Sequence, residues 1–224
     1  MYLVHVRQPR DPLLDRALEE LIAGRAAHAL ALPPLPIALS SQWGEGRGEG
    51  QPHTPEQAAA SHPNPLPAPS AGARGEGIHP GRADGEHRTA ADQLAAARRH
   101  LDEAVEGLRR AGHEQYLPNG LLARAAFRID AHRAGVADGD LAGAEQDLTE
   151  THEIAARGGM RLHLTDYQLT SGQLVLAHDP ALAHPDSRRY AEDCWTAARD
   201  LVAATGYHRR DPDLAALRAA IDGA

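Results

Sequence analysis

The chain has 224 residues, enough for one or two ordinary domains, and carries a formal net charge of -8. Its acidic residues are interspersed with arginines, so it lacks the basic stripe that binds a phosphate backbone, which argues against nucleic acid as a partner. No run of 18 apolar residues and no signal peptide occur, and the lone Cys194 cannot form an internal disulfide. We therefore expect a reduced, cytoplasmic protein that does not enter a membrane.

The first predicted element is a helix within residues 11–32, periodic over 13–32, which we interpret as helix A of a first helix pair. Residues 33–88 follow and hold ten of the 16 prolines and nine of the 21 glycines. Such a composition cannot bury enough apolar surface to offset chain entropy, so it predicts a disordered insertion of about 55 residues. Its proline-rich stretches 33–36 and 63–69 leave open a docking role in polyproline II form.

Residues 89–224 read as a succession of helices with short connections. The apolar periodicity predicts six of them, at 89–111, 117–134, 140–157, 160–177, 187–205 and 211–221. For the last we expect Asp211 at the N-cap and Pro212 at the first helical position. This last helix presents one apolar face, which predicts that it caps the helices before it.

A spacing of 47 residues recurs among the second helices of the expected pairs. It places small and large apolar residues at matching offsets on one stripe of each helix, which predicts a packing face. The matching sets are Ala97, Ala144 and Ala191; Leu101, Leu148 and Trp195; Ala104, Thr151 and Ala198; and Leu108, Ala155 and Val202. Three glycines at the same spacing, Gly112, Gly159 and Gly206, are expected to end these helices with positive φ.

The first helices of the pairs share a leucine followed three residues later by a small residue, which lets a neighbouring helix approach closely. The matching segments are Leu21-Ile22-Ala23-Gly24, Leu122-Ala123-Arg124-Ala125 and Leu169-Thr170-Ser171-Gly172. The first segment precedes the second by 101 residues, which exceeds the 47-residue spacing by 54. This excess is close to the length of segment 33–88. We therefore predict an all-α fold, an α-α superhelix of about three helix pairs with a C-terminal capping helix and a long disordered insertion.

These residues resemble the tetratricopeptide repeat (TPR), with alanine, a large apolar residue and alanine in the second helix of each pair. The resemblance is nearer still to the C-terminal repeats of bacterial NACHT-type or related STAND ATPases, in the stretches QYLPNGLLARAA (115–126), GDLAGA (139–144), GGMRLHL (158–164) and GYHRRDP (206–212). It implies a TPR-like helical solenoid. The 47-residue spacing departs from the usual 34, and a chain without lysine has no phosphate-binding loop of the G-x-x-x-x-G-K-[ST] kind.

Catalytic and metal-binding patterns are weak in this sequence. Fourteen histidines occur, but no H-E-x-x-H does, so we expect no metal and no cofactor. The glycine tract 44–50 lacks the G-x-G-x-x-G spacing, and neither a G-x-S-x-G motif nor a histidine partner for Cys194 supports a nucleophile. We expect no enzyme activity, with a His-assisted hydrolase as the remaining catalytic rival.

The function predicted is that of a non-catalytic scaffold that binds another protein or peptide. The candidate binding residues are Arg124, Arg128, Asp166 and Gln173, which the TPR resemblance would place on the concave face. In the competing interpretation Arg161, His163, Asp166 and the run 207–211 tie neighbouring helices together. An alternative function is the sensor or regulatory fragment of a STAND-type ATPase whose nucleotide-binding part is encoded elsewhere. The sequence specifies neither the partner nor the oligomeric state.

Overall fold

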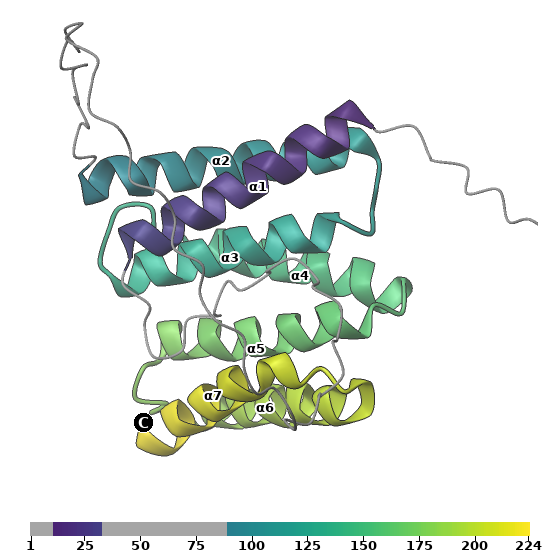
Figure 1. Cartoon of the computed structure of the whole chain (residues 1–224). Coiled ribbons are helices and arrows are strands. Elements are labelled where there is room, and N and C mark those ends of the chain that lie inside the picture. Colours follow the sequence, from purple (N-terminus) through teal and green to yellow (C-terminus); the bar gives the residue numbers. More distant parts are fainter. Residues whose placement is uncertain (1–10, 33–88) are drawn as a thin grey trace, which may run out of the picture. The chain divides into compact units, whose positions relative to one another are not determined.

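The computed structural model describes residues 11–32 and 89–224, and every regular element within them is a helix (Figure 1). The elements are α1 (Pro12–Ala31), α2 (Ala90–Ala111), α3 (Leu117–Arg133), α4 (Leu141–Arg157), α5 (Arg161–His178), α6 (Pro185–Thr205), the short 3-10 helix η1 (His208–Arg210) and α7 (Asp211–Gly223). The predicted all-α fold is thus confirmed for this part of the chain. Segment 33–88, predicted to be a disordered insertion, lies outside the described residues.

Side-chain caps explain where several helices begin. The Asp11 carboxylate accepts a hydrogen bond from the Leu13 N–H at 2.9 Å, and Thr89 and Asp92 form a reciprocal capping box at the start of α2. Asp140 caps α4 by accepting from the Gly143 N–H at 2.8 Å. These contacts satisfy backbone donors that a helix start leaves without a partner in the helix.

The start of the last helix differs from the prediction. Asp211 is the first residue of α7 and not its N-cap, because η1 has already brought the backbone into helical geometry. Arg210 occupies the cap position and makes no side-chain cap hydrogen bond. The Asp211 carboxylate instead faces His208, with 3.1 Å between Oδ2 and Nδ1.

The three glycines spaced by 47 residues all adopt the left-handed conformation predicted for them. Their φ angles are 69° at Gly112, 63° at Gly159 and 71° at Gly206. A side chain is strained in this conformation, so glycine is the residue that ends a helix here without cost.

Neighbouring helices pack as pairs, α1 with α2, α3 with α4 and α5 with α6, and α7 follows against α5 and α6 (Figure 1). Helix α3 also contacts α1 and α5, and α5 contacts α7, so the odd-numbered helices touch in succession. Among the described residues α2, α4 and α6 make no direct backbone contact with one another. The odd-numbered helices therefore form the continuous side of this helical unit.

The small and apolar residues predicted to form a packing face are buried. Ala97, Ala144 and Ala191 are each 0% exposed, and the other members of the four sets are buried as well, apart from the partly buried Trp195. The predicted close approach at the small residues is also present. A Cβ added at Gly24 would lie 2.8 Å from Leu101 Cγ, and one at Gly172 would lie 2.8 Å from Leu217 Cδ2.

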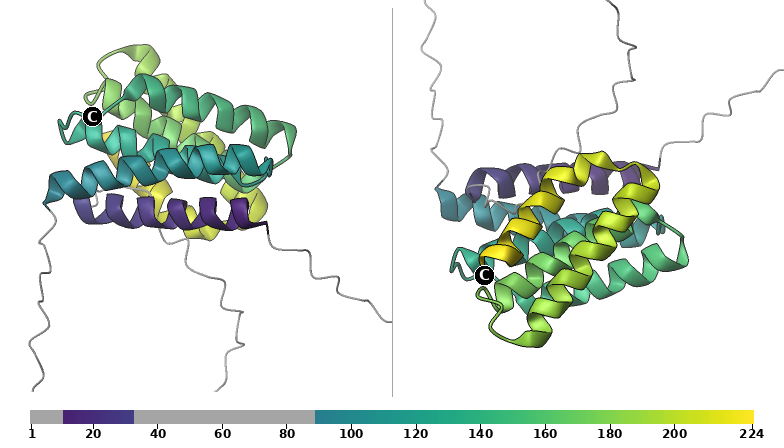
Figure 2. Two further views of the ribbon diagram at one scale, coloured as in Figure 1. Left: turned by 90° about the horizontal axis from the view of Figure 1, so that it is seen from above. Right: turned by 90° about the horizontal axis from the view of Figure 1, so that it is seen from below.

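Helices α1 and α2 run antiparallel and lie alongside each other in both views of Figure 2. Ala17 contacts the position of Gly107, and Gly24, two turns later, contacts Leu101, so the order reverses between the helices. Within the described residues no helix combines the length and apolar character needed to cross a bilayer.

Candidate functional site

A first charged network, the Asp147 network, joins α2, α3 and α4 and consists of Asp102, Arg124, Arg128 and Asp147. Asp147 accepts from Arg124 Nε at 3.0 Å and Nη2 at 2.7 Å, and from Arg128 Nη1 at 2.7 Å. Arg124 also donates to Asp102 Oδ1 at 3.1 Å. Burial opposes the charge of Arg124, but Asp147 and Asp102 together hold its pKa above the ordinary value.

The backbone of α4 completes the Asp147 network. Arg128 Nη1 donates to the Gly143 carbonyl at 2.8 Å, and a Cβ at Gly143 would lie 2.9 Å from that same Nη1. Arg124 and Arg128 lie one turn apart on α3 and so reach the same carboxylate. These two predicted binding residues therefore join helices in this structure, and their role toward a partner stays a prediction.

A second charged group, the Asp166 cluster, is formed where α5 meets η1 and α7. Arg210 donates from Nε to Asp166 Oδ1 at 2.7 Å and from Nη1 to Asp213 Oδ2 at 3.2 Å. All three side chains are buried, and the Arg210 guanidinium also lies 5.6 Å from the centre of the Tyr207 ring. A single guanidinium is thus shared by two buried carboxylates.

The Asp166 cluster extends to α1 and α3 through Arg25, Asn119 and His163. Arg25 Nη2 donates to the Asn119 carbonyl at 3.2 Å, and its charge interacts with Asp166, Arg210 and Tyr207. His163 Nε2 lies 3.2 Å from Asn119 Oδ1. The complete cluster contains Arg25, Asn119, His163, Asp166, Tyr207, Arg210 and Asp213, which come from α1, α3, α5, α7 and the turn containing η1.

Burial shifts the titration of several members of the Asp166 cluster. Desolvation lowers the pKa of Arg25 to about 10 and lowers that of His163 below its ordinary value. It raises the pKa of Asp166, and the Arg210 guanidinium opposes that rise. Perturbed groups gathered at one place are typical of functional sites, although structural ion pairs produce such shifts too.

The Asp166 cluster has a buried base and a rim that reaches the surface. Asp166, Arg210 and Asp213 form the base, whereas Arg25, Asn119, His163 and Tyr207 are each only partly buried. The rim residues lie on α1, α3 and α5 and on the turn before η1, so they belong to the side where the odd-numbered helices touch. A molecule lying across these helices would meet the rim.

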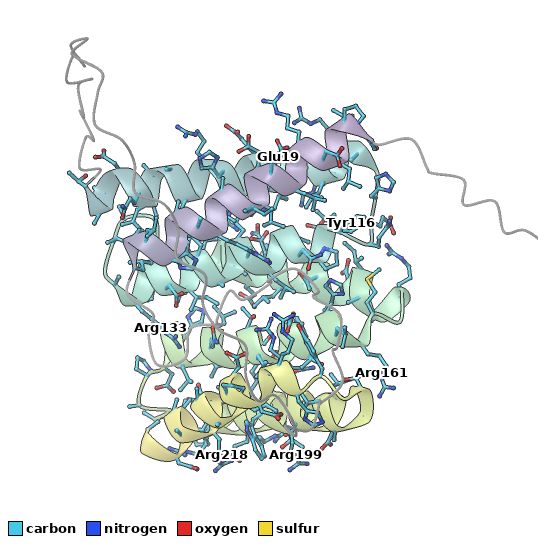
Figure 3. All side chains as sticks on the ribbon, in the orientation of Figure 1. Glu19, Tyr116, Arg133, Arg161, Arg199 and Arg218 are labelled. Carbon is cyan, nitrogen blue, oxygen red and sulfur yellow. The ribbon has the colours of Figure 1, made fainter. Side chains whose placement is uncertain are left out.

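A third polar group links α1, α3 and α5 near the carboxyl end of α3, where Figure 3 labels Arg133. His28 Nε2 lies 3.2 Å from Asp130 Oδ2, while the buried Asp130 Oδ1 has no hydrogen-bond partner among the described residues. Arg133 Nη2 donates to the Gln173 carbonyl at 2.9 Å, and the Gln173 side chain is buried. The Gln173 backbone is thus part of this group.

The four predicted site residues do not share one set of partners. Arg124 and Arg128 belong to the Asp147 network, Asp166 to the cluster around Arg210, and Gln173 lies against Arg133. Asp166 and Gln173 are only 2% and 3% exposed, so neither side chain is open at the surface, and a ligand would reach Asp166 through the rim of its cluster. Arg25 and Asn119 were not among the predicted residues. No local motif marks them, because their contacts join residues 94 positions apart.

Cys194 and Trp195 both pack against other side chains of the helical unit. Cys194 is buried, and desolvation raises the pKa of its thiol to about 11. The guanidiniums of Arg199 and Arg218 lie 5.0 and 5.3 Å from the centre of the Trp195 ring, and Figure 3 labels both arginines near α6 and α7. A thiol with a raised pKa is mostly protonated at neutral pH and is therefore a poor nucleophile.

Comparison with known proteins gives no match for this chain, whether to a family model, to a curated protein or to a solved structure. The function proposed for the chain therefore rests on its helices and its polar groups.

Proposed function

We propose that the chain is a non-catalytic, TPR-like helical scaffold that binds another protein through a peptide segment. Two features support this proposal. Helices α1, α3, α5 and α7 contact one another in succession, and the residues spaced by 47 occupy matching buried positions in α2, α4 and α6. Stacked helix pairs of this kind offer an extended surface along one side, which is how helical repeat proteins bind their partners.

The observation that carries the proposal is the rim of the Asp166 cluster. Its side chains come from several helices that are distant in sequence, and they are partly buried before any ligand arrives. Groups that are already fixed lose little conformational entropy on binding, so the site is preorganised. Arg25 is the rim member with the largest charged donor group, and arginine is frequent among the residues that dominate binding energy.

The bound segment would lie across α1, α3 and α5, as an extended or helical peptide. Arg25 would donate to its carbonyl or carboxylate oxygens, and Asn119 and His163 would offer further hydrogen bonds. The Asp147 network lies between α3 and the second helices of the pairs, so we assign it to holding the helices in place.

A phage-displayed peptide library selected on the full chain tests this function. Affinities of an enriched peptide are then measured by fluorescence polarisation for the original chain, for Arg25→Ala and for Arg98→Ala. Arg98 is the matched control, because it is exposed on α2 and pairs with Asp138 at 2.7 Å. Thermal unfolding followed by circular dichroism verifies that all three chains are folded.

We expect Arg25→Ala to weaken binding by about tenfold or more, and Arg98→Ala to leave it within about twofold. Failure to enrich any peptide, or equal affinities for the original chain and Arg25→Ala, would overturn the proposal.

A further inference from the structure

Three metal-ligating side chains meet between α1 and α2, away from the three polar groups described above. Glu20 on α1 and His100 and Glu103 on α2 each offer one ligand atom, and these atoms lie within 4.8 Å of one another. His100 Nδ1 is 2.6 Å from Glu20 Oε2. His100 and Glu103 are three residues apart on α2 and therefore lie on the same side of that helix.

These ligands lie where small residues let α1 and α2 pack closely. Glu20 lies between Ala17 and Gly24, which pack against α2 so tightly that a Cβ at Gly24 would lie 2.8 Å from Leu101 Cγ. A Cβ at Gly107 would likewise lie 2.8 Å from that of Ala17. Because two contacts of this kind hold the helices together, the backbone positions that carry the three ligands are held by the scaffold.

Among residues 11–32 and 89–224 the two carboxylates have no arginine partner, although the chain has 23 basic residues, all of them arginine. Within these ranges Glu20 pairs with His100 alone, and Glu103 has neither a hydrogen bond nor an ion pair, not even with Arg99, one turn before it. The buried Asp147 and Asp166 are, in contrast, both paired with arginine.

Two carboxylates held this close repel each other, and a cation placed between them removes that cost. We propose that Glu20, His100 and Glu103 bind one divalent transition-metal ion, with zinc as the ion to test. One imidazole nitrogen and two carboxylate oxygens suit zinc, and three protein ligands leave a coordination position for water. The bound ion clamps α1 to α2, and this role does not depend on the proposed peptide binding.

The sequence predicted no metal site, because no local ligand motif such as H-E-x-x-H occurs in it. Glu20 and His100 are 80 residues apart and separated by segment 33–88, so no local motif unites them. Only the packing of α1 on α2 brings them together.

Isothermal titration calorimetry of the full, metal-free chain with zinc chloride tests the proposed zinc site. The variants are Glu103→Gln and His100→Ala, with His113→Ala as the control, because His113 pairs with Asp11 at 3.2 Å but has no third ligand beside it. Glu103 is exposed and its replacement is isosteric, so this variant keeps its fold even if His100→Ala does not. Comparison between variants removes the contribution of the other histidines.

We expect the original chain and His113→Ala to bind one more equivalent of zinc than the two ligand variants, or to bind it about tenfold or more tightly. Zinc should also raise the unfolding temperature of the first two proteins and not of Glu103→Gln. Without metal, Glu103→Gln should unfold at the same or a higher temperature than the original chain, because the repulsion is gone. Equal stoichiometry and affinity in all four proteins would overturn the metal site.

Discussion

The Asp147 network and the Asp166 cluster solve the problem of buried charge in opposite ways. In the first, one buried carboxylate is shared by two guanidiniums from the same helix. In the second, one buried guanidinium is shared by two carboxylates from different elements. The first network reaches water through its arginines and Asp102, whereas the base of the second is covered and reaches the surface only through its rim.

This difference separates a structural role from the proposed binding role. The arginines of the Asp147 network have their donors occupied by Asp147, Asp102 and the Gly143 carbonyl, and they hold α3 against its neighbours. The Asp166 cluster instead draws on helices along the proposed binding side and includes an arginine whose pKa is already lowered by burial. A ligand that contacts Arg25 changes the surroundings of the whole cluster.

The largest expected effect is that of Arg210→Met. This variant leaves Asp166 and Asp213 buried without their shared cation, which costs about 4 kcal/mol in the free energy of unfolding. Urea unfolding measures the loss. Arg98→Met should change stability little, because its ion pair is exposed. A loss in Arg210→Met no larger than in Arg98→Met would contradict the assignment of a buried, shared guanidinium.

Asp147→Ala should cost less, about 2 kcal/mol in the free energy of unfolding, although it removes the acceptor of two arginines. The Arg124 side chain is 12% exposed and keeps Asp102, and Arg128 also reaches solvent, so neither is left as an isolated buried charge. Urea unfolding shows which of the two variants, Asp147→Ala or Arg210→Met, loses more free energy of unfolding. If Asp147→Ala proved more damaging than Arg210→Met, the contrast between the network open to water and the covered cluster would be wrong.

The smallest expected effect is the change in the free energy of unfolding with pH that His163 causes. Burial lowers the pKa of His163, so the folded state resists protonation that the unfolded chain accepts below about pH 6.5. The stability contributed by neutral His163 is therefore present above that pH and is lost as the pH falls toward the lowered value. His163→Gln removes this dependence, and urea unfolding at pH 7 and pH 5.5 should show a smaller acid-induced loss in the variant. Equal losses in both chains would show that His163 is not held neutral.

The helices and their ends could be predicted from the sequence because they depend on local patterns. Alanines spaced by 47 residues marked the buried stripe, and Gly112 and Gly206 marked left-handed ends. The start of α7 was misplaced by one residue because η1, a single 3-10 turn, leaves no clear signal in the periodicity.

The polar groups could not be predicted in the same way. Spacing put Arg124 and Arg128 on one face of α3, but only the rotation of α3 in the unit decides that this face meets Asp147. Arg25 and Asn119 come together from distant parts of the chain, and no pattern distinguishes Arg25 from the other arginines. Arg210 and Asp166, in contrast, were among the residues expected to tie neighbouring helices together, and they form an ion pair. Burial of a charge depends on tertiary packing, which local periodicity does not contain.

Hydrogen–deuterium exchange of the full chain, measured with and without a peptide enriched by the selection, locates the surface that the peptide covers. Binding should slow exchange in α1, α3 and α5, around Arg25, Asn119 and His163. Slowed exchange confined to α2, α4 and α6 would place the partner on the other side of the unit and contradict the proposed binding side.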